Sequence, residues 1–196
     1  MATTAEQLAL PSAERRSDPS VTVYGILALG VSAVIVLGAL FGAYLALRSG
    51  TKVWPPKGVV VQDYFGITLS FTALMAALTG WWALYGVRRG EQRQAAVALA
   101  LQVFLQGASI NLLTYVIRSS GLSPRTDAFA VVYYALNIAV VALLATGMGV
   151  GVVALARVLG GQVTPQEPAL GWAAAWYGTF VSVGWMVMYT AVYVVI

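Results

Sequence analysis

The sequence predicts an all-α fold: a polytopic membrane protein built as a bundle of five transmembrane helices. Five stretches carry no charged side chain, and each is long enough to form such a helix. A helix rises about 1.5 Å per residue, so about 20 residues cross the ~30 Å hydrocarbon layer. A transmembrane β-barrel would need segments of about ten residues with alternating polarity. The uncharged stretches are continuously apolar and cover residues 19–47, 64–87, 94–117, 128–156 and 168–196.

The first 18 residues mix Ala, Ser, Pro and charges of both signs. They lack the basic start, short apolar core and cleavage site of a signal peptide. We therefore expect a flexible N-terminal tail at 1–18 and a five-helix transmembrane domain at 19–196. The expected helices cover about 21–47, 64–87, 94–117, 128–156 and 170–196.

Local signals bound the first two helices. Ser20, after Asp18 and Pro19, is a candidate N-cap of the first helix. The connector that follows contains Pro55 and Pro56, which break any helix. The second helix ends in an aromatic cluster typical of a membrane interface, formed by Trp81, Trp82 and Tyr85.

The remaining connectors are short and rich in turn-forming or basic residues. The turn at 88–93, RRGEQR, forces the second and third helices to be antiparallel neighbours. The connectors at 118–127 and 157–168 contain Gly, Ser and Pro. Basic residues favour the cytoplasmic side, so the compact turn at 88–93 predicts a cytoplasmic N-terminus and a C-terminus outside.

The residue types that are missing limit the chemistry of this chain. It contains no histidine and no cysteine, so the usual ligands of haem, copper, zinc and iron–sulfur centres are missing. Its ionisable groups lie at the ends of the uncharged stretches, whereas ion and proton pathways usually place them within the membrane. We therefore predict no catalytic, cofactor or metal site. The net charge of +4 reflects lipid anchors at helix ends rather than a nucleic-acid partner.

The third helix carries a polar face. Gln102, Gln106 and Ser109 fall on one side by helical spacing, and Asn111 lies nearby in the sequence. A buried amide needs a hydrogen-bond partner, for which Asn137 on the fourth helix is a candidate. Hydrogen bonds between helices explain this face most simply; a lipid headgroup, a quinone or a water chain is the alternative.

Two helices contain Gly-x-x-x-Gly, which lets helix backbones approach closely. The pairs are Gly38 with Gly42 and Gly147 with Gly151. Each predicts either a contact inside the bundle or a specific contact with another subunit.

Two segments carry a family resemblance. The segment 41–56, FGAYLALRSGTKVWPP, has an aromatic helix end, an arginine and a Trp-Pro-Pro loop. The segment 179–193, TFVSVGWMVMYTAVY, carries Phe180, Val181, Trp185 and Tyr193. Both resemble subunit III of haem–copper cytochrome c oxidases in its short five-helix bacterial form. Phe41, Tyr44, Arg48, Trp54, Pro55 and Pro56 match the first family pattern in order.

The chain also departs from that family. Thr179 and Ser182 stand where the last family helix has His and Asp, and Ala33 is near the place of a family glutamate. Val140 and Leu143 lie near the positions of histidines in the fourth helix. The resemblance therefore indicates a divergent subunit III, or a paralogue that serves a related complex.

The resemblance implies a non-catalytic accessory subunit of a respiratory haem–copper oxygen reductase. Haem and copper are expected in a partner subunit, and the partners are that haem-bearing subunit, other respiratory subunits and phospholipids. The implied location is the bacterial inner membrane. A small-solute transporter or channel component, or an accessory subunit of another respiratory or nitric-oxide-reducing complex, is the alternative. The candidate lipid or subunit contacts are Gly38, Gly42, Arg48, Trp54, Gln102, Gln106 and Asn137.

Overall fold

The computed structural model confirms an all-α bundle, with no strand in the part of the chain that it describes. It describes residues 19–56, 63–123, 125, 127–190 and 192. The tail expected at 1–18 and the last residues of the expected fifth helix lie outside this part. The helices are α1 (Pro19–Gly50), α2 (Asp63–Arg89), α3 (Gln92–Ser119), α4 (Ala128–Leu159) and α5 (Ala169–Tyr189).

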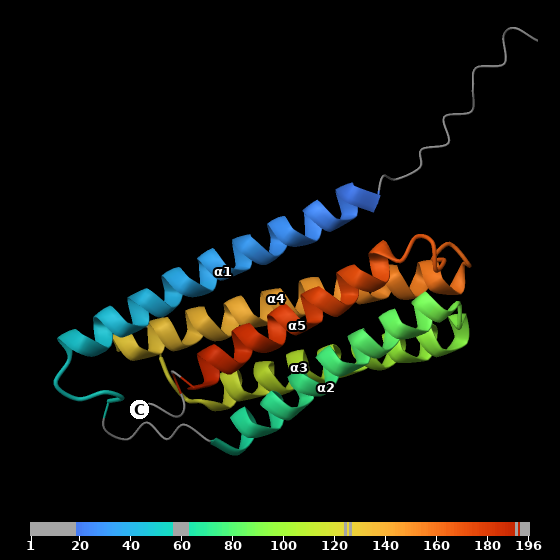
Figure 1. The fold of residues 1–196 in the computed structure, drawn as a ribbon. Helices are drawn as coiled ribbons and strands as arrows, with labels where there is room; N and C mark the ends of the chain where they lie inside the picture. Colours follow the sequence, from blue (N-terminus) through green and yellow to red (C-terminus); the bar gives the residue numbers. More distant parts are fainter. Residues whose placement is uncertain (1–18, 57–62, 124, 126, 191, 193–196) are drawn as a thin grey trace, which may run out of the picture.

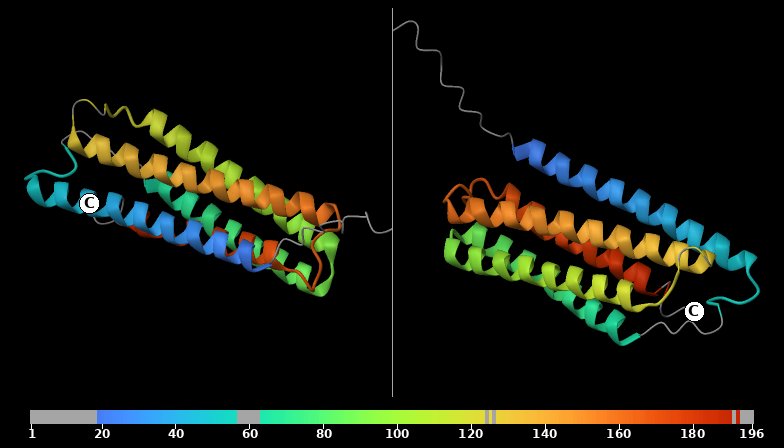
Figure 2. Two further views of the ribbon diagram at one scale, coloured as in Figure 1. Left: turned by 90° about the horizontal axis from the view of Figure 1, so that it is seen from above. Right: turned by 180° about the vertical axis from the view of Figure 1, so that it is seen from behind.

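The five helices run up and down, side by side (Figure 1). The α2–α3 turn, the α4–α5 connector and the start of α1 share one end of the bundle, which we call the basic end because it holds Arg88, Arg89 and Arg93. α2 packs against α3 and α5, and α3 also packs against α4. α1 packs mainly on α4 and α5, at one side of the bundle (Figure 2).

The α2–α3 hairpin is tight because of two glycines. Gly90 has a φ of 74°, which an L side chain rarely adopts. The Glu91 backbone N–H donates to the Gly86 carbonyl at 2.9 Å. A Cβ on Gly86 would lie only 2.9 Å from the backbone nitrogen of Ala95, so the two helices approach almost backbone to backbone.

Side-chain hydrogen bonds join α5 to α2. The Ser182 hydroxyl donates to the Ala73 carbonyl at 2.7 Å, and the Trp185 indole N–H donates to the Ser70 hydroxyl at 2.9 Å. All three side chains that make these bonds are buried. In a bundle surrounded by lipid, such bonds replace the hydrophobic driving force that water would supply.

α1 is the least packed helix. Its buried side chains include Ala33 and Tyr44, while most of its large apolar side chains are exposed. Leu37 of α1 meets α5 at Gly184, where a Cβ would lie 2.9 Å from the leucine Cδ1. α1 therefore contacts the bundle along one narrow edge and leaves the rest of its surface free.

Four helices in the described part are long and apolar enough to cross a membrane: α1, α2, α3 and α4. α5 is not among these four, but its 21 described residues are close to the ~20 that the hydrocarbon layer requires. It lies alongside the other helices (Figure 1), and its Gly, Trp and Tyr residues lower its hydropathy. The expectation of a multi-pass membrane protein is confirmed.

We predict that Gly86→Ala destabilises the protein by about 1–3 kcal/mol, because the new methyl group overpacks the α2–α3 contact. Thermal unfolding in detergent micelles, followed by tryptophan fluorescence, measures this change. Gly149→Ala is the matched control, since nothing lies within 4 Å of a Cβ there. Equal melting temperatures for both variants would contradict the close approach.

Candidate functional site

An aromatic cluster fixes the end of α1 that lies away from the basic end. The Trp54 indole N–H donates to the Tyr44 hydroxyl at 3.1 Å. The Trp54 ring also meets Tyr44 edge-on at 5.5 Å and Phe129, from the start of α4, at 5.1 Å between centroids. Arg48 lies half-buried in the last turn of α1, next to this cluster in the sequence. The segment that carries the first resemblance therefore ties α1 to α4.

The two Gly-x-x-x-Gly pairs have different surroundings. A Cβ on Gly147 would lie 3.0 Å from Gln106 and from Tyr177, and one on Gly151 would lie 2.9 Å from Val103. The α4 pair is thus a contact inside the bundle. Gly38 and Gly42 are exposed, and nothing lies within 4 Å of a Cβ at either position. The α1 pair faces outward and makes no contact within the described chain.

An apolar groove separates the first half of α1 from α5. Its volume is about 650 Å³. The α1 wall runs from Val23 to Val34 and the α5 wall from Ala169 to Val183. No charged side chain lines it. The lining residues are Val23, Ile26, Leu27, Gly30, Val31, Val34, Ala169, Trp172, Ala173, Trp176, Tyr177, Thr179, Phe180 and Val183.

Arginines and tryptophans gather beside this groove at the basic end. The Arg88 guanidinium lies 4.5 Å above the ring of Trp172, a groove residue. Trp81 meets both Trp172 and Trp176 edge-on, and its indole N–H donates to the Thr179 hydroxyl at 2.8 Å. Aromatic and cationic side chains together are typical of the boundary between lipid headgroups and acyl chains.

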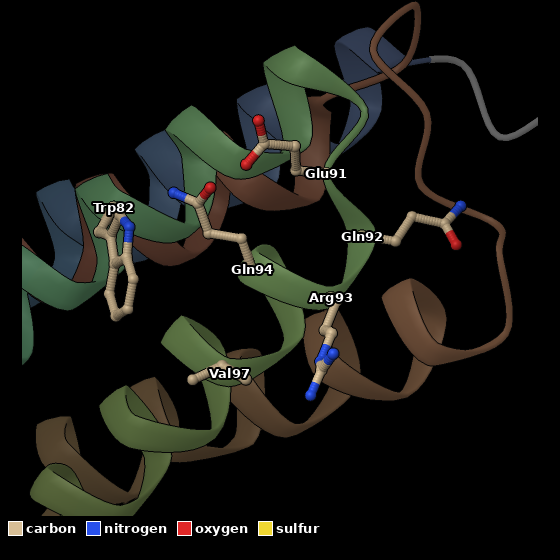
Figure 3. A pocket seen from close by; sticks show the side chains of 6 residues that line it. All are labelled: Trp82, Glu91, Gln92, Arg93, Gln94 and Val97. Carbon is tan, nitrogen blue, oxygen red and sulfur yellow. The ribbon is translucent and has the colours of Figure 1, made fainter.

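A second hollow lies on the surface of the α2–α3 turn, about 770 Å³ in volume (Figure 3). Trp82 comes from α2, and Glu91 directly precedes α3. With the Gln94 amide oxygen turned toward Trp82, the indole N–H donates to it at 2.6 Å, and the amide N–H donates to Glu91. This hollow is open to the surface and has polar side chains at its rim. Such side chains are expected where the end of a helix is anchored at the membrane interface. Its lining residues are Trp82, Glu91, Gln92, Arg93, Gln94 and Val97.

Gln102 crosses from α3 to α5 at the centre of the bundle. Its amide N–H donates to the Ala174 carbonyl at 3.0 Å. If Gly80 or Gly178 carried a side chain, its Cβ would lie only 2.9 Å or 2.6 Å, respectively, from the same nitrogen. The glycines on α2 and α5 therefore provide the space that the buried Gln102 amide occupies. The role of this amide is a hydrogen bond between α3 and α5.

The other polar residues of this face are buried as predicted, but they do not form one network. Ser109 donates to Leu105 on its own helix, and Asn137 donates to Tyr133 on its own helix. No hydrogen bond links Asn137 to Gln102 or Gln106 among the described residues. Three buried amide oxygens, those of Gln102, Gln106 and Asn137, have no partner within the described chain.

The residues that differ from the pattern of the resembled family form hydrogen bonds or are buried in the bundle. Thr179 accepts from Trp81 and Ser182 donates to Ala73, so two hydroxyls of α5 face α2. Ala33 is buried in α1, and Val140 is buried in α4. Short side chains at these places allow close packing, and sequence patterns alone do not reveal these contacts.

No cluster of three or more metal-ligating His, Cys, Asp or Glu side chains exists within residues 19–56, 63–123 and 127–190. The Asp, Lys and Arg side chains of the described helices lie in their first or last turns, and only tyrosines lie deeper. The arrangement therefore offers apolar and hydrogen-bonding surfaces for lipids or other helices.

Similarity to known proteins agrees with the resemblance. The chain is 28% identical over 184 residues to cytochrome c oxidase subunit 3 of Salmo salar, which covers 87% of this chain and 68% of the relative. Subunit 3 of Marchantia polymorpha is 29% identical over 186 residues, covering 87% and 67%. Subunit 3 of Triticum aestivum is 28% identical with the same coverage. No protein-family model matches the chain.

We predict that Gln102→Glu destabilises the bundle by about 3 kcal/mol or more, because an ionised carboxylate would lose the donor and face the Ala174 carbonyl. Gln102→Leu should change stability by only about 1 kcal/mol, since it removes the donor and the unpaired oxygen together. Thermal unfolding of both variants at neutral pH in one detergent tests this. Equal damage from the two changes would contradict it.

Proposed function

We propose that this chain is a divergent member of the cytochrome c oxidase subunit III family and an accessory subunit of a respiratory haem–copper oxygen reductase. The observation that carries the proposal is the similarity to subunit 3, which extends over 87% of the chain. The resemblance in segments 41–56 and 179–193 supports it, because both segments form packing contacts in the fold. The chain is thus part of an oxidoreductase complex.

The subunit is non-catalytic in this proposal, and its partner holds the haems and the copper. The 196-residue sequence contains neither histidine nor cysteine, and imidazole and thiolate are the usual protein ligands of these metals. The contribution of this chain is then to support the catalytic subunit and to hold lipids around it.

We assign the groove between α1 and α5 to phospholipid acyl chains. Residues 23–34 of α1 extend over about 17 Å, close to the ~15 Å depth of one leaflet. The lining of the groove carries no charged side chain and only two hydroxyl groups, those of Tyr177 and Thr179, which suits acyl chains. Acyl chains fit this space, and Arg88 beside Trp172 offers a guanidinium to the phosphate.

The outward glycines of α1 are the proposed contact with another subunit. Gly38 and Gly42 leave the helix backbone open, and close approach of a second helix there needs no rearrangement. Arg48 and Trp54, at the end of the same helix, extend this surface to the membrane boundary.

The proposed location is a bacterial inner membrane with the N-terminus in the cytoplasm. The basic end of the bundle, with its turn at 88–93, would face the cytoplasm. A small-solute transporter is not favoured, because Gln102 and Gln106 are each packed against glycine backbone and the relatives are oxidase subunits.

We predict that the tagged chain, purified from its own membranes in mild detergent, brings with it a haem-bearing partner. Reduced-minus-oxidised absorption spectra and peptide mass spectrometry of the purified sample identify that partner. The chain expressed alone should show no haem absorption. Purification of the chain from its own membranes without any haem protein would refute the oxidase assignment.

We predict that Gly30→Leu lowers lipid binding by about one phospholipid per chain, because the side chain fills the groove that serves one leaflet. Native mass spectrometry after delipidation and re-addition of phosphatidylglycerol counts the bound molecules. Gly25→Leu is the control, since Gly25 is on the same helix but does not line the groove. If both variants bind lipid equally, the groove is not the lipid site.

A further inference from the structure

A row of exposed side chains follows the outer face of α3. α3 is flanked by α2 and α4 (Figure 2), and the residues of this row are exposed. The exposed residues alternate at spacings of four and three, which is the heptad pattern of a helix that packs along a second helix. We call this row the α3 seam; its members are Val97, Leu101, Phe104, Ala108, Asn111 and Tyr115.

One member of the α3 seam is polar and lies in the uncharged part of this candidate transmembrane helix. Asn111 is exposed and precedes Arg118 by seven residues, about 10 Å along the helix axis. Its amide makes no hydrogen bond with the described residues of this chain. An amide surrounded by hydrocarbon has no water to bind, so it needs a partner that offers hydrogen-bonding groups.

The seam is hollowed beside Asn111. A shallow depression of about 570 Å³ lies between the rings of Phe104 and Tyr115, above Gly107 and Ala108. Both rings are exposed, so they form the walls of a socket. In packed helix pairs such a socket receives one side chain of the facing helix.

We propose that the α3 seam docks a transmembrane helix of another subunit, which inserts a side chain above Ala108 and hydrogen-bonds to Asn111. The inference rests on the proposed function, because that function supplies the neighbouring subunit. The chemistry favours a helix over a lipid, since Asn111 lies about 10 Å from Arg118 along the helix, at a depth where a lipid offers acyl chains rather than its ester or phosphate oxygens. A single polar residue in an apolar seam also fixes the register of the two helices.

The absence of cysteine from the chain permits a direct test with single-cysteine variants. Val97, Leu101, Phe104, Ala108, Asn111 and Tyr115 are each replaced by Cys, labelled with a benzophenone maleimide in native membranes and illuminated. We expect adducts with one partner polypeptide, strongest at positions 104, 108 and 111. Ile138→Cys on α4, which is also exposed, is the control and should yield none with that polypeptide.

Two substitutions test the energetics in the intact complex. Asn111→Leu should reduce co-purification of the partner roughly threefold to thirtyfold, as expected for one hydrogen bond between membrane helices. Ala108→Trp should reduce it further by filling the socket. Ala145→Trp, at an exposed alanine of α4, should have no effect, and unchanged melting temperatures verify that all three variants fold.

The outcomes separate this inference from the function on which it rests. If the haem-bearing partner purifies with the wild-type chain and both seam variants retain it fully, the seam proposal fails and the oxidase assignment stands. Adducts at twice the mass of this chain would show a second copy on the seam and overturn the proposal. Adducts with lipid alone would overturn it as well. If the wild-type chain has no haem-bearing partner, the oxidase assignment itself fails.

Discussion

The insertion of Gln102 between α2 and α5 is the interaction that organises the bundle. A primary amide in hydrocarbon must find a partner, and the Ala174 carbonyl provides one at 3.0 Å. The amide fits there only because Gly80 and Gly178 have no side chains. Polar attraction and close backbone approach therefore act at the same place, which is how membrane helices associate without a strong hydrophobic force.

The same principle separates α1 from the other helices. α2, α3, α4 and α5 meet through glycines and buried polar groups, whereas α1 meets the bundle through Leu37, Tyr44 and the Trp54 cluster. Its outward glycines remain uncovered and an apolar groove opens beside its first half. A helix attached along one edge needs other molecules around it, and lipids and neighbouring subunits are the molecules that a membrane offers.

The described contacts also show what the chain uses at the positions where it departs from the resembled family. Thr179 and Ser182 stand where the resembled family has His and Asp, yet both hydroxyls bond to α2. Trp185, which matches the family pattern, bonds to Ser70 on the same neighbour. The α2–α5 contact thus uses short hydroxyl side chains, so its geometry is independent of ionisable groups.

The class of fold, the helices and the lack of the usual metal ligands follow from the amino-acid sequence, because charge-free stretches and residue types are local properties. The sequence also indicated the buried face of Gln102, Gln106 and Ser109, since polar residues at helical spacing are rarely left in lipid. The packing of the helices was needed to show that Gly147 and Gly151 face the bundle while Gly38 and Gly42 face outward. Likewise, it decided that Asn137 bonds within its own helix and that Asn111 lies on the outer surface. Helices that are apolar nearly all round show no difference between a polar and an apolar face, so the sequence does not indicate which face is buried. Packing against the neighbouring helices decides this.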